Sequence, residues 1–311
     1  MEKILITGSL GQIGSELLPK LQEQHGIDNV IALYNRKEPD NQPGIFVQAN
    51  VLDQPKIEQI VKDHQITTIY HLASLLSATG EAKPHLAWDV NVNGLKIILD
   101  LAVKYNCKVF WPSSIAAFGP TTPRHNTPQQ TTLEPTTMYG VTKVTGELMC
   151  QYYWHKFNVD VRSLRYPGII SYKTPPGGGT TDYAVAAFYD GITDGQYEYF
   201  VKPDTCLPMM YMDDAVNATL QLMETDAQNI TIRTSYNLAA ISFTAEELTQ
   251  AIKAQIPFEA TYVPDFRQSI ADSWPTSIDD SIARRDWGWD HTFDLPKMTE
   301  TMIQNLRKKL T

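Results

Sequence analysis

The chain has 311 residues, 42% of them hydrophobic, so it can bury a large core in one α/β unit or in one unit with a smaller lobe. Its formal charge of −9, from 35 acidic and 26 basic residues, argues against nucleic acid and anionic membranes as partners, because both attract basic proteins. The 3 cysteines form no CxxC pair and the 7 histidines no HxxxH pair, so neither a disulfide framework nor a metal site is predicted.

The first predicted element is a short buried strand at residues 4–6, with the sequence ILI. It breaks into TGSLGQIG at 7–14 and then into a helix over 15–21. Glycines at such a place let the backbone turn tightly and approach a ligand, and the N–H groups at the start of the helix attract an anion. The stretch therefore predicts a dinucleotide-phosphate site, and the alternative is a plain strand-to-helix turn.

Short apolar strands and helices alternate as far as residue 165. The predicted strands are 30–33, 46–47, 68–70, 108–111 and 161–165, and the predicted helices are 57–62, 88–104 and 138–157. Strands separated by helices favour a parallel sheet covered on both faces. The predicted fold class is therefore α/β, a Rossmann-type doubly wound parallel sheet, whose ligands bind at the carboxyl ends of the strands.

The composition changes after Arg165. The stretch YPGIISYKTPPGGGTTDY at 166–183 is rich in proline, glycine and threonine, which is typical of a long functional loop. We expect a dinucleotide-binding domain at 1–167, to which the chain returns around 211–240, and a smaller substrate-binding lobe formed mainly by 168–311.

One pair of side chains on the predicted helix 138–157 has the spacing of an acid–base site. Tyr139 and Lys143 lie four residues apart and share a face of the helix. A nearby ammonium group favours ionisation of the phenol, whose reference pKa is about 10, so that Tyr139 can act as a base toward an alcohol. An exposed helix pair is the alternative. The same spacing recurs at Tyr152 and Lys156, where we expect Tyr152 to serve packing.

These motifs resemble those of the extended short-chain dehydrogenase/reductases, the family that includes UDP-galactose 4-epimerase. The resemblance covers nearly the whole chain and rests on the glycine loop, on Ser114 and on the pair of Tyr139 and Lys143. Several stretches are similar, more narrowly, to the short-chain L-threonine 3-dehydrogenases: LLSATGE at 75–81, FWPSSIAAFGPTTP at 110–123, RYPGIISYKTPPGGGTTDYAV at 165–185, PMMYMDDA at 208–215 and PDFRQSIADSWP at 264–275.

The resemblance implies that NAD lies across the strand ends. Its pyrophosphate would lie over the glycine loop, its adenine near Asn50 and Val51, and its nicotinamide opposite Tyr139. The cofactor-binding residues expected in this way are Gly8, Gly11, Gln12, Ile13, Asn35, Asn50, Val51, Leu72, Ala73, Asn91, Tyr139, Lys143, Tyr166 and Pro167.

The resemblance also implies a reaction, the oxidation of the L-threonine side-chain hydroxyl to 2-amino-3-oxobutanoate in threonine catabolism. Ser114 and Tyr139 would hold the hydroxyl, Tyr139 would remove its proton, and Lys143 would lower the pKa of Tyr139 and hold the nicotinamide ribose. N–H groups of the glycine-rich loop at 177–182 would bind the substrate carboxylate, and the loop would close as a lid. The alternative for Thr181 and Asp182 is that they cap the helix that follows. The expected substrate-binding residues are Ser77, Ser114, Tyr139, Gly179, Thr180 and Trp274.

At one position the sequence departs from this pattern. Tyr34 stands where an acidic residue would bind the adenosine ribose hydroxyls, and Arg36 follows. An arginine there suits a 2′-phosphate, so NADP is the alternative to NAD. With NAD, Asn35 would replace the missing hydrogen-bond acceptor.

Two other functions remain open. A nucleotide-sugar epimerase or dehydratase would keep the fold, although Ser114 is followed by Ile115 and Ala116 instead of the Asp-Glu pair of such dehydratases. A non-catalytic cofactor-sensing protein would also keep the fold but has no need of Tyr139 and Lys143.

The remaining expectations concern assembly and location. In the resembled family, two long helices of each subunit form a four-helix bundle, so we expect a homodimer through the helices around 89–104 and 139–157. No apolar run approaches the roughly 18 residues of a membrane-spanning helix, and the first residues do not read as a signal peptide. We therefore expect a cytoplasmic protein whose partners are a small-molecule substrate and a second copy of itself.

Overall fold

The computed structural model describes residues 2–36, 38–39 and 42–310. The chain divides into two compact units, each made of three segments. Unit 1 comprises 1–113, 137–164 and 219–236, and unit 2 comprises 114–136, 165–218 and 237–311.

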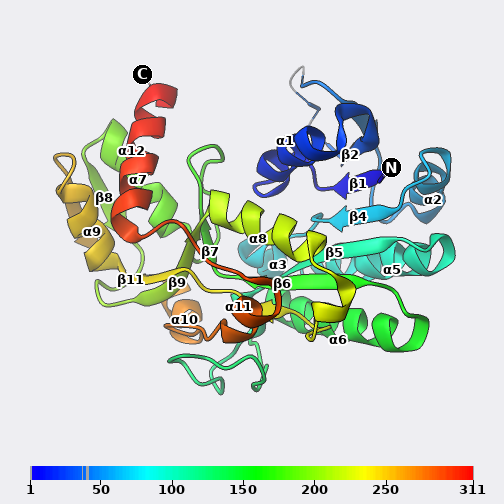
Figure 1. Ribbon diagram of the computed structural model, residues 1–311. Helices are drawn as coiled ribbons and strands as arrows, with labels where there is room; N and C mark the ends of the chain where they lie inside the picture. Colours follow the sequence, from blue (N-terminus) through cyan, green and yellow to red (C-terminus); the bar gives the residue numbers. More distant parts are fainter. Residues whose placement is uncertain (1, 37, 40–41, 311) are drawn as a thin grey trace. The chain divides into compact units, whose positions relative to one another are not determined.

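The largest sheet has seven strands in the order β10-β6-β5-β4-β1-β2-β3 (Figure 1). In chain order these strands are β1 (Ile4–Thr7), β2 (Val30–Tyr34), β3 (Ile45–Gln48), β4 (Thr68–His71), β5 (Lys108–Ser114), β6 (Val161–Tyr166) and β10 (Tyr236–Asn237). Strand β1 pairs in parallel with β2 and β4, β2 with β3, and β4 with β5. The predicted parallel α/β sheet is confirmed, and each predicted strand lies within an observed one.

Unit 1 also contains helices, and the longer ones bury apolar side chains. The helices include α1 (Gly14–His25), η1 (Ile27–Asn29), α2 (Gln54–Asp63), α3 (Ser77–Ala82), α5 (Gly94–Tyr105), α6 (Met138–Phe157) and η4 (Ala227–Asn229). One core cluster joins α2, α5 and α6 to the strands and includes Ile57, Ile69, Leu99 and Cys150. Helix α6 has the predicted bounds because Thr137 accepts a hydrogen bond from the Gly140 amide at its start and Asn158 adopts a left-handed conformation at its end.

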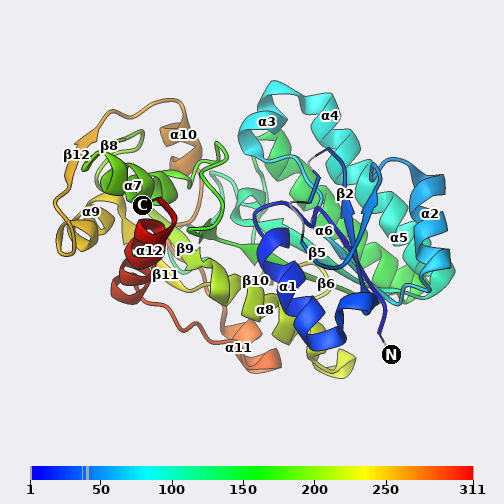
Figure 2. The ribbon, with the colours of Figure 1, turned by 90° about the horizontal axis from the view of Figure 1, so that it is seen from above.

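The helix predicted over 88–104 is confirmed as one continuous helical segment, but it contains a π-turn that was not predicted. The segment consists of α4 (Pro84–Trp88), the π-helical turn η2 (Asp89–Asn93) and α5. Figure 2 shows α4 beside α3, both in cyan. A π-turn takes one more residue than an α-turn without interrupting the run of apolar side chains, so the periodicity of the sequence does not reveal it.

Unit 2 contains two smaller sheets. Strands β7 (Gly168–Ile170), β9 (Cys206–Tyr211) and β11 (Ile241–Thr244) form one, and β8 (Gln196–Tyr199) and β12 (Glu259–Tyr262) form the other. The other elements are η3 (Ile115–Ala117), α7 (Tyr183–Thr193), α9 (Ala245–Lys253), α10 (Arg267–Asp272), α11 (Ser281–Trp287) and α12 (Leu295–Leu310), and α8 (Met212–Glu224) has residues in both units. Among the described residues, no helix is long and apolar enough to cross a membrane.

Candidate active site

The glycine loop of unit 1 lies between β1 and α1. Gly8 has φ +68°, and a Cβ there would lie 2.8 Å from the Ala73 amide nitrogen. A Cβ on Gly14 would lie 2.2 Å from the Gly8 carbonyl oxygen. Both positions therefore require glycine, and they bring the loop against the chain that leaves β4.

The predicted phosphate-binding residues lie together at the start of α1. Ile13 is the N-cap and has no side-chain oxygen to accept a hydrogen bond from the first amides of the helix, and such amides lack partners within the helix. Gly11 is exposed and Gln12 is half-buried. The amides of Ser15, Glu16 and Leu17 already donate to the carbonyls of Gly11 and Ile13, so an anion would be bound by the amides just before them, at 12–14. Glycine at 8 and 14 keeps the loop tightly folded on neighbouring backbone, a shape that suits a dinucleotide phosphate.

The end of β4 borders this loop. The Ala73 amide donates a hydrogen bond to Thr7 Oγ1 (3.3 Å), and the same hydroxyl shares one with Nδ1 of the buried His71 (2.8 Å). Burial, and to a smaller extent the charge of Lys143, lower the pKa of His71 to about 3. The imidazole is therefore uncharged at neutral pH, and its hydrogen bond to Thr7 gives it a structural role.

The residues predicted near the adenosine differ in exposure. Asn35 is exposed directly after β2, and its carbonyl accepts a hydrogen bond from Gln48 (3.0 Å). Asn50 is exposed after β3, but its Oδ1 accepts a hydrogen bond from the Leu52 amide (3.0 Å). The Val51 side chain is buried, so Asn35 and Asn50 have the side chains that reach solvent here.

Asn91 lies in the π-turn and holds two neighbouring segments. Its Oδ1 accepts a hydrogen bond from the Leu75 amide (2.8 Å), and its Nδ2 donates to the Leu75 carbonyl (3.0 Å) and to Thr142 Oγ1 (3.1 Å). The side chain thus ties the chain after β4 to α6, and its contact with a cofactor stays a prediction. Leu72 and Ala73 lie in the chain between these bonds and β4.

The Tyr139–Lys143 pair is not an exposed helix pair. Lys143 is 2% exposed, and its Nζ donates a hydrogen bond to the Pro112 carbonyl (2.6 Å). The same Nζ lies 5.2 Å from the centre of the Tyr139 ring and 4.7 Å from that of Trp111. Burial, opposed by the charge of Glu147, lowers the pKa of Lys143 to about 7. An ammonium group that titrates near neutrality, beside a half-buried phenol, suits proton transfer.

The second pair of the same spacing has a different environment. Tyr152 contacts the rings of Tyr153 and Phe157 but is 55% exposed. The prediction that Tyr152 serves packing is therefore wrong in part, because the residue lies on the outer face of α6.

Four further predicted site residues lie at or next to the ends of helices and strands. Ser77 is buried at the start of α3. In unit 2, Ser114 is the last residue of β5 and accepts a hydrogen bond from the Ala116 amide (3.2 Å). Tyr166 and Pro167 are both buried, and the Tyr166 hydroxyl donates to the Ala215 carbonyl (3.5 Å).

The glycine-rich loop of unit 2 differs from its expected role. The amides of Gly177 and Gly179 donate hydrogen bonds to Asp182 Oδ2 (2.7 and 2.8 Å). These N–H groups, predicted to bind the substrate carboxylate, therefore bind a carboxylate of the same loop. Thr180 and Trp274 are buried. The sequence signal for the role of Asp182 was its close spacing from the two glycines.

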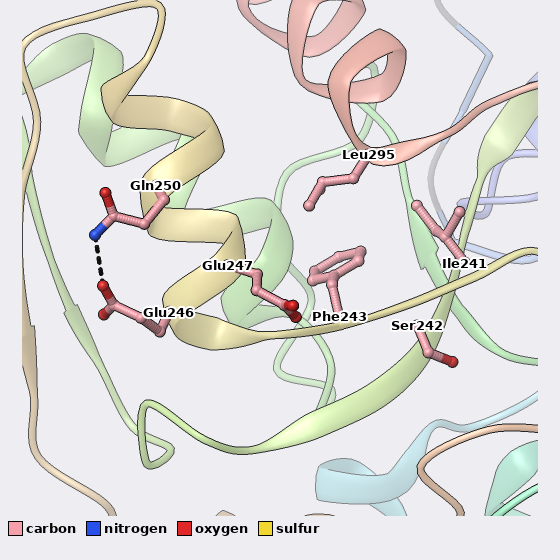
Figure 3. Close-up of a pocket in the computed structure, with 7 residues that line it drawn as sticks. All are labelled: Ile241, Ser242, Phe243, Glu246, Glu247, Gln250 and Leu295. Carbon is pink, nitrogen blue, oxygen red and sulfur yellow. Dashed lines mark hydrogen bonds between the residues drawn. The ribbon is translucent and has the colours of Figure 1, made fainter.

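One pocket of unit 2 lies outside the predicted site. Figure 3 shows its lining residues, with an apolar floor of Ile241, Phe243 and Leu295 and with Glu246 bonded to Gln250 (2.5 Å). The pocket has a volume of ≈ 420 Å³, and none of its lining residues is among those predicted from the sequence.

Two glutamates near Tyr139 and Lys143 were missed by the sequence reasoning. Glu81 Oε1 accepts a hydrogen bond from the Met138 amide at the start of α6 (2.6 Å), and Glu147 Oε1 accepts one from Ser113 Oγ (2.6 Å). The signal for Glu147 was its place four residues after Lys143 on the same helix face. No comparable signal marks Glu81.

Comparisons with known proteins agree with this geometry. The model of the NAD dependent epimerase/dehydratase family matches residues 4–239. The mitochondrial L-threonine 3-dehydrogenase of Bos taurus is 48% identical over 306 residues, which are 97% of this chain and 82% of the bovine one.

Two solved structures are similar over nearly their whole length. A monomeric L-threonine 3-dehydrogenase from a metagenome, in its apo form, is 51% identical, with a TM-score of 0.96 over 99% of this chain and 100% of the other. The holo form of an L-threonine dehydrogenase from Cupriavidus necator is 50% identical, with a TM-score of 0.96 over 98% and 99%. The chain is therefore a member of the NAD-dependent epimerase/dehydratase family, with NAD as its cofactor.

Proposed function

We propose that the protein is an L-threonine 3-dehydrogenase, which oxidises the side-chain hydroxyl of L-threonine to 2-amino-3-oxobutanoate. The observation that carries the proposal is the buried Lys143 ammonium group beside Tyr139, on a chain about half identical to dehydrogenases of that name. In the proposal, NAD binds at the glycine loop between β1 and α1, and the substrate residues of the loop at 177–182 and of the chain beyond it are Thr180 and Trp274.

The proposed reaction begins at the phenol. Tyr139, as phenolate, takes the proton of the substrate hydroxyl as the carbinol C–H bond breaks and a carbonyl group forms. Lys143 stabilises the phenolate by its charge, and Ser114 holds the substrate oxygen. NAD, when bound, supplies the hydride acceptor. Ser77 contacts the substrate in this scheme.

An assay with both cofactors tests the activity. Purified protein with L-threonine is expected to reduce NAD, measured by the absorbance of the reduced cofactor, and to reduce NADP at a much lower rate. Asn35 would then accept a ribose hydroxyl where Tyr34 replaces the acidic residue. A preference for NADP would show that Arg36 decides the choice, and absence of reduction with either cofactor would contradict the dehydrogenase proposal and direct attention to UDP-sugars.

We further propose a homodimer through α5 and α6. Val141, Leu148 and Tyr152 recur at spacings of seven and four on α6 and are exposed, as is Val103 on α5. Such a stripe shares one face of the helix, and the two helices are in contact within unit 1.

Replacement of Leu148, which is 59% exposed, tests the dimer. Leu148→Glu is expected to convert a dimer into a monomer in light scattering, because a carboxylate would be buried in the interface. Val263→Glu, at an exposed apolar residue of unit 2, is the control and should leave the mass unchanged. A monomeric unsubstituted protein, as one relative is described, would contradict the proposal.

The proposed location is the cytoplasm. The three cysteines are free thiols, and two of them, Cys107 and Cys150, are buried, which agrees with a reducing compartment. The bovine relative is mitochondrial, and fractionation of cells expressing the protein tests the location.

A further inference from the structure

Two hydrogen bonds one helical turn apart join α6 to the end of β5. Lys143 Nζ donates to the Pro112 carbonyl, and Ser113 Oγ donates to Glu147 Oε1, each over 2.6 Å. Pro112 and Ser113 are consecutive, and Ser114 follows them directly. The helix that carries Tyr139 is thus hydrogen-bonded to the end of the strand that carries Ser114.

The close approach of helix and strand has its cause in the sequence. A Cβ on Gly146 would lie 2.3 Å from the Trp111 ring, so the absence of a side chain lets α6 lie directly on β5. This approach buries Glu147, which is 1% exposed. A buried carboxylate costs free energy unless it is hydrogen-bonded and paired with a positive charge. Its presence here therefore requires a compensating role or partner.

Glu147 has such a partner one turn away. Its negative charge raises the pKa of Lys143 against the larger, opposite effect of burial, and it also raises that of the buried Cys150. Glu147 thus favours the charged form of the lysine that lies beside Tyr139.

We propose that Glu147 is a positioning residue of the reaction, whose carboxylate anchors Ser113 and keeps the Lys143 ammonium group charged and in place. This inference rests on the proposed function, because it concerns how Tyr139 and Ser114 are held for the same reaction. Glu147 acts through its neighbours and touches neither substrate nor cofactor in this scheme.

Other titratable groups of the described residues also lie near Lys143. Tyr139 and Cys150 belong to the same helix, and His71 of β4 is uncharged. Further titratable groups lie on the other elements that pack on α6. Glu81 of α3 is hydrogen-bonded to the Met138 amide, and Asp100 of α5 to Lys96 and Tyr153. The others include His85 of α4 and Asp89 of η2. Glu147 is therefore the group whose removal should change the titration of the pair.

Glu147→Gln removes the charge and keeps the size and the acceptor oxygen. Tyr139 and Lys143 titrate as a coupled pair, and loss of a nearby negative charge favours loss of the first proton. The rising limb of kcat/KM against pH is expected to move by about one unit to lower pH. Glu147→Ala should show the same shift and, because Ser113 loses its anchor, a fall in kcat of about tenfold.

Asp214 offers a matched control in unit 2. It is also 1% exposed and accepts hydrogen bonds from the Thr292 hydroxyl (2.7 Å) and from the Thr292 and Phe293 amides. Asp214→Asn should destabilise the fold without moving the pH limb. An unmoved limb in Glu147→Gln, or an equal shift in Asp214→Asn, would overturn the proposal.

Two measurements keep the test independent of folding problems and of the assigned substrate. If Glu147→Gln does not fold, Glu147→Asp is the second variant, because it keeps the charge but moves the carboxylate away from Ser113. Its kcat should fall while the rising limb of the pH profile stays in place. An unchanged kcat would contradict the proposal that Glu147 anchors Ser113. The titration of Lys143 can also be followed by NMR of [13C]lysine-labelled protein, with Lys143→Ala to assign the signal. A lower midpoint in Glu147→Gln supports the proposal even if the unsubstituted protein fails to oxidise threonine, and an unchanged midpoint contradicts it.

Discussion

Tyr139→Phe is expected to lower kcat for L-threonine oxidation by about three orders of magnitude, within the range by which general-base groups accelerate reactions. The substitution removes one oxygen atom and so abolishes the proton acceptor while leaving the ring beside Lys143. Affinity for NAD, measured by calorimetry, should change little, because the glycine loop binds the phosphates. Stopped-flow turnover and binding together separate loss of chemistry from loss of cofactor.

Tyr152→Phe is the matched control, since it makes the same chemical change on the same helix and on a tyrosine with the same spacing to a lysine. Tyr152 is half exposed and lies about three and a half turns from Tyr139 along α6. Turnover should persist in this variant. Equal losses in both variants, or undiminished turnover in Tyr139→Phe, would remove Tyr139 from the role of base and would favour a non-catalytic, cofactor-sensing protein.

The parts of the fold that follow local rules were predictable from the sequence. The buried strands of the large sheet are short apolar runs, and α6 begins and ends at Thr137 and Asn158, whose side chain and backbone conformation mark helix ends. The π-turn at Asp89–Asn93 was not predictable, because it is stabilised by contacts of Asn91 with Leu75 and Thr142, which are distant in sequence.

The site residues could be predicted where only one residue type fits the backbone or where two side chains have a characteristic spacing. Gly8 and Gly14 stand where backbone atoms leave no room for a side chain, and spacing alone linked Tyr139 to Lys143. The role of Asp182 depends on a loop folding back on itself, and that of Glu147 depends on how closely α6 approaches β5 at Gly146. Such contacts arise from packing, which no local pattern in the sequence contains.

Gly14→Ala is expected to abolish cofactor binding at ordinary concentrations and to lower the free energy of unfolding by about 3 kcal/mol. The added Cβ would lie 2.2 Å from the Gly8 carbonyl oxygen and within 3 Å of the Ser9 backbone. Since these neighbours are backbone atoms, the whole loop must move, and the amides at the start of α1 move with it. Loss of two hydrogen bonds to a charged phosphate, at about 1.5 kcal/mol each, weakens binding about 100-fold.

Gly11→Ala gives the graded comparison in the same loop. Its Cβ would lie 3.2 Å from the same carbonyl oxygen, and Gly11 is exposed with a negative φ, so a shift of a few tenths of an ångström accommodates it. Thermal unfolding with and without NAD should show a small loss of stability and a retained shift by NAD in Gly11→Ala, against a large loss and no shift in Gly14→Ala. If Gly14→Ala kept the shift by NAD, Gly14 would be required only for the tight turn between β1 and α1. The loop would then have no part in binding the cofactor.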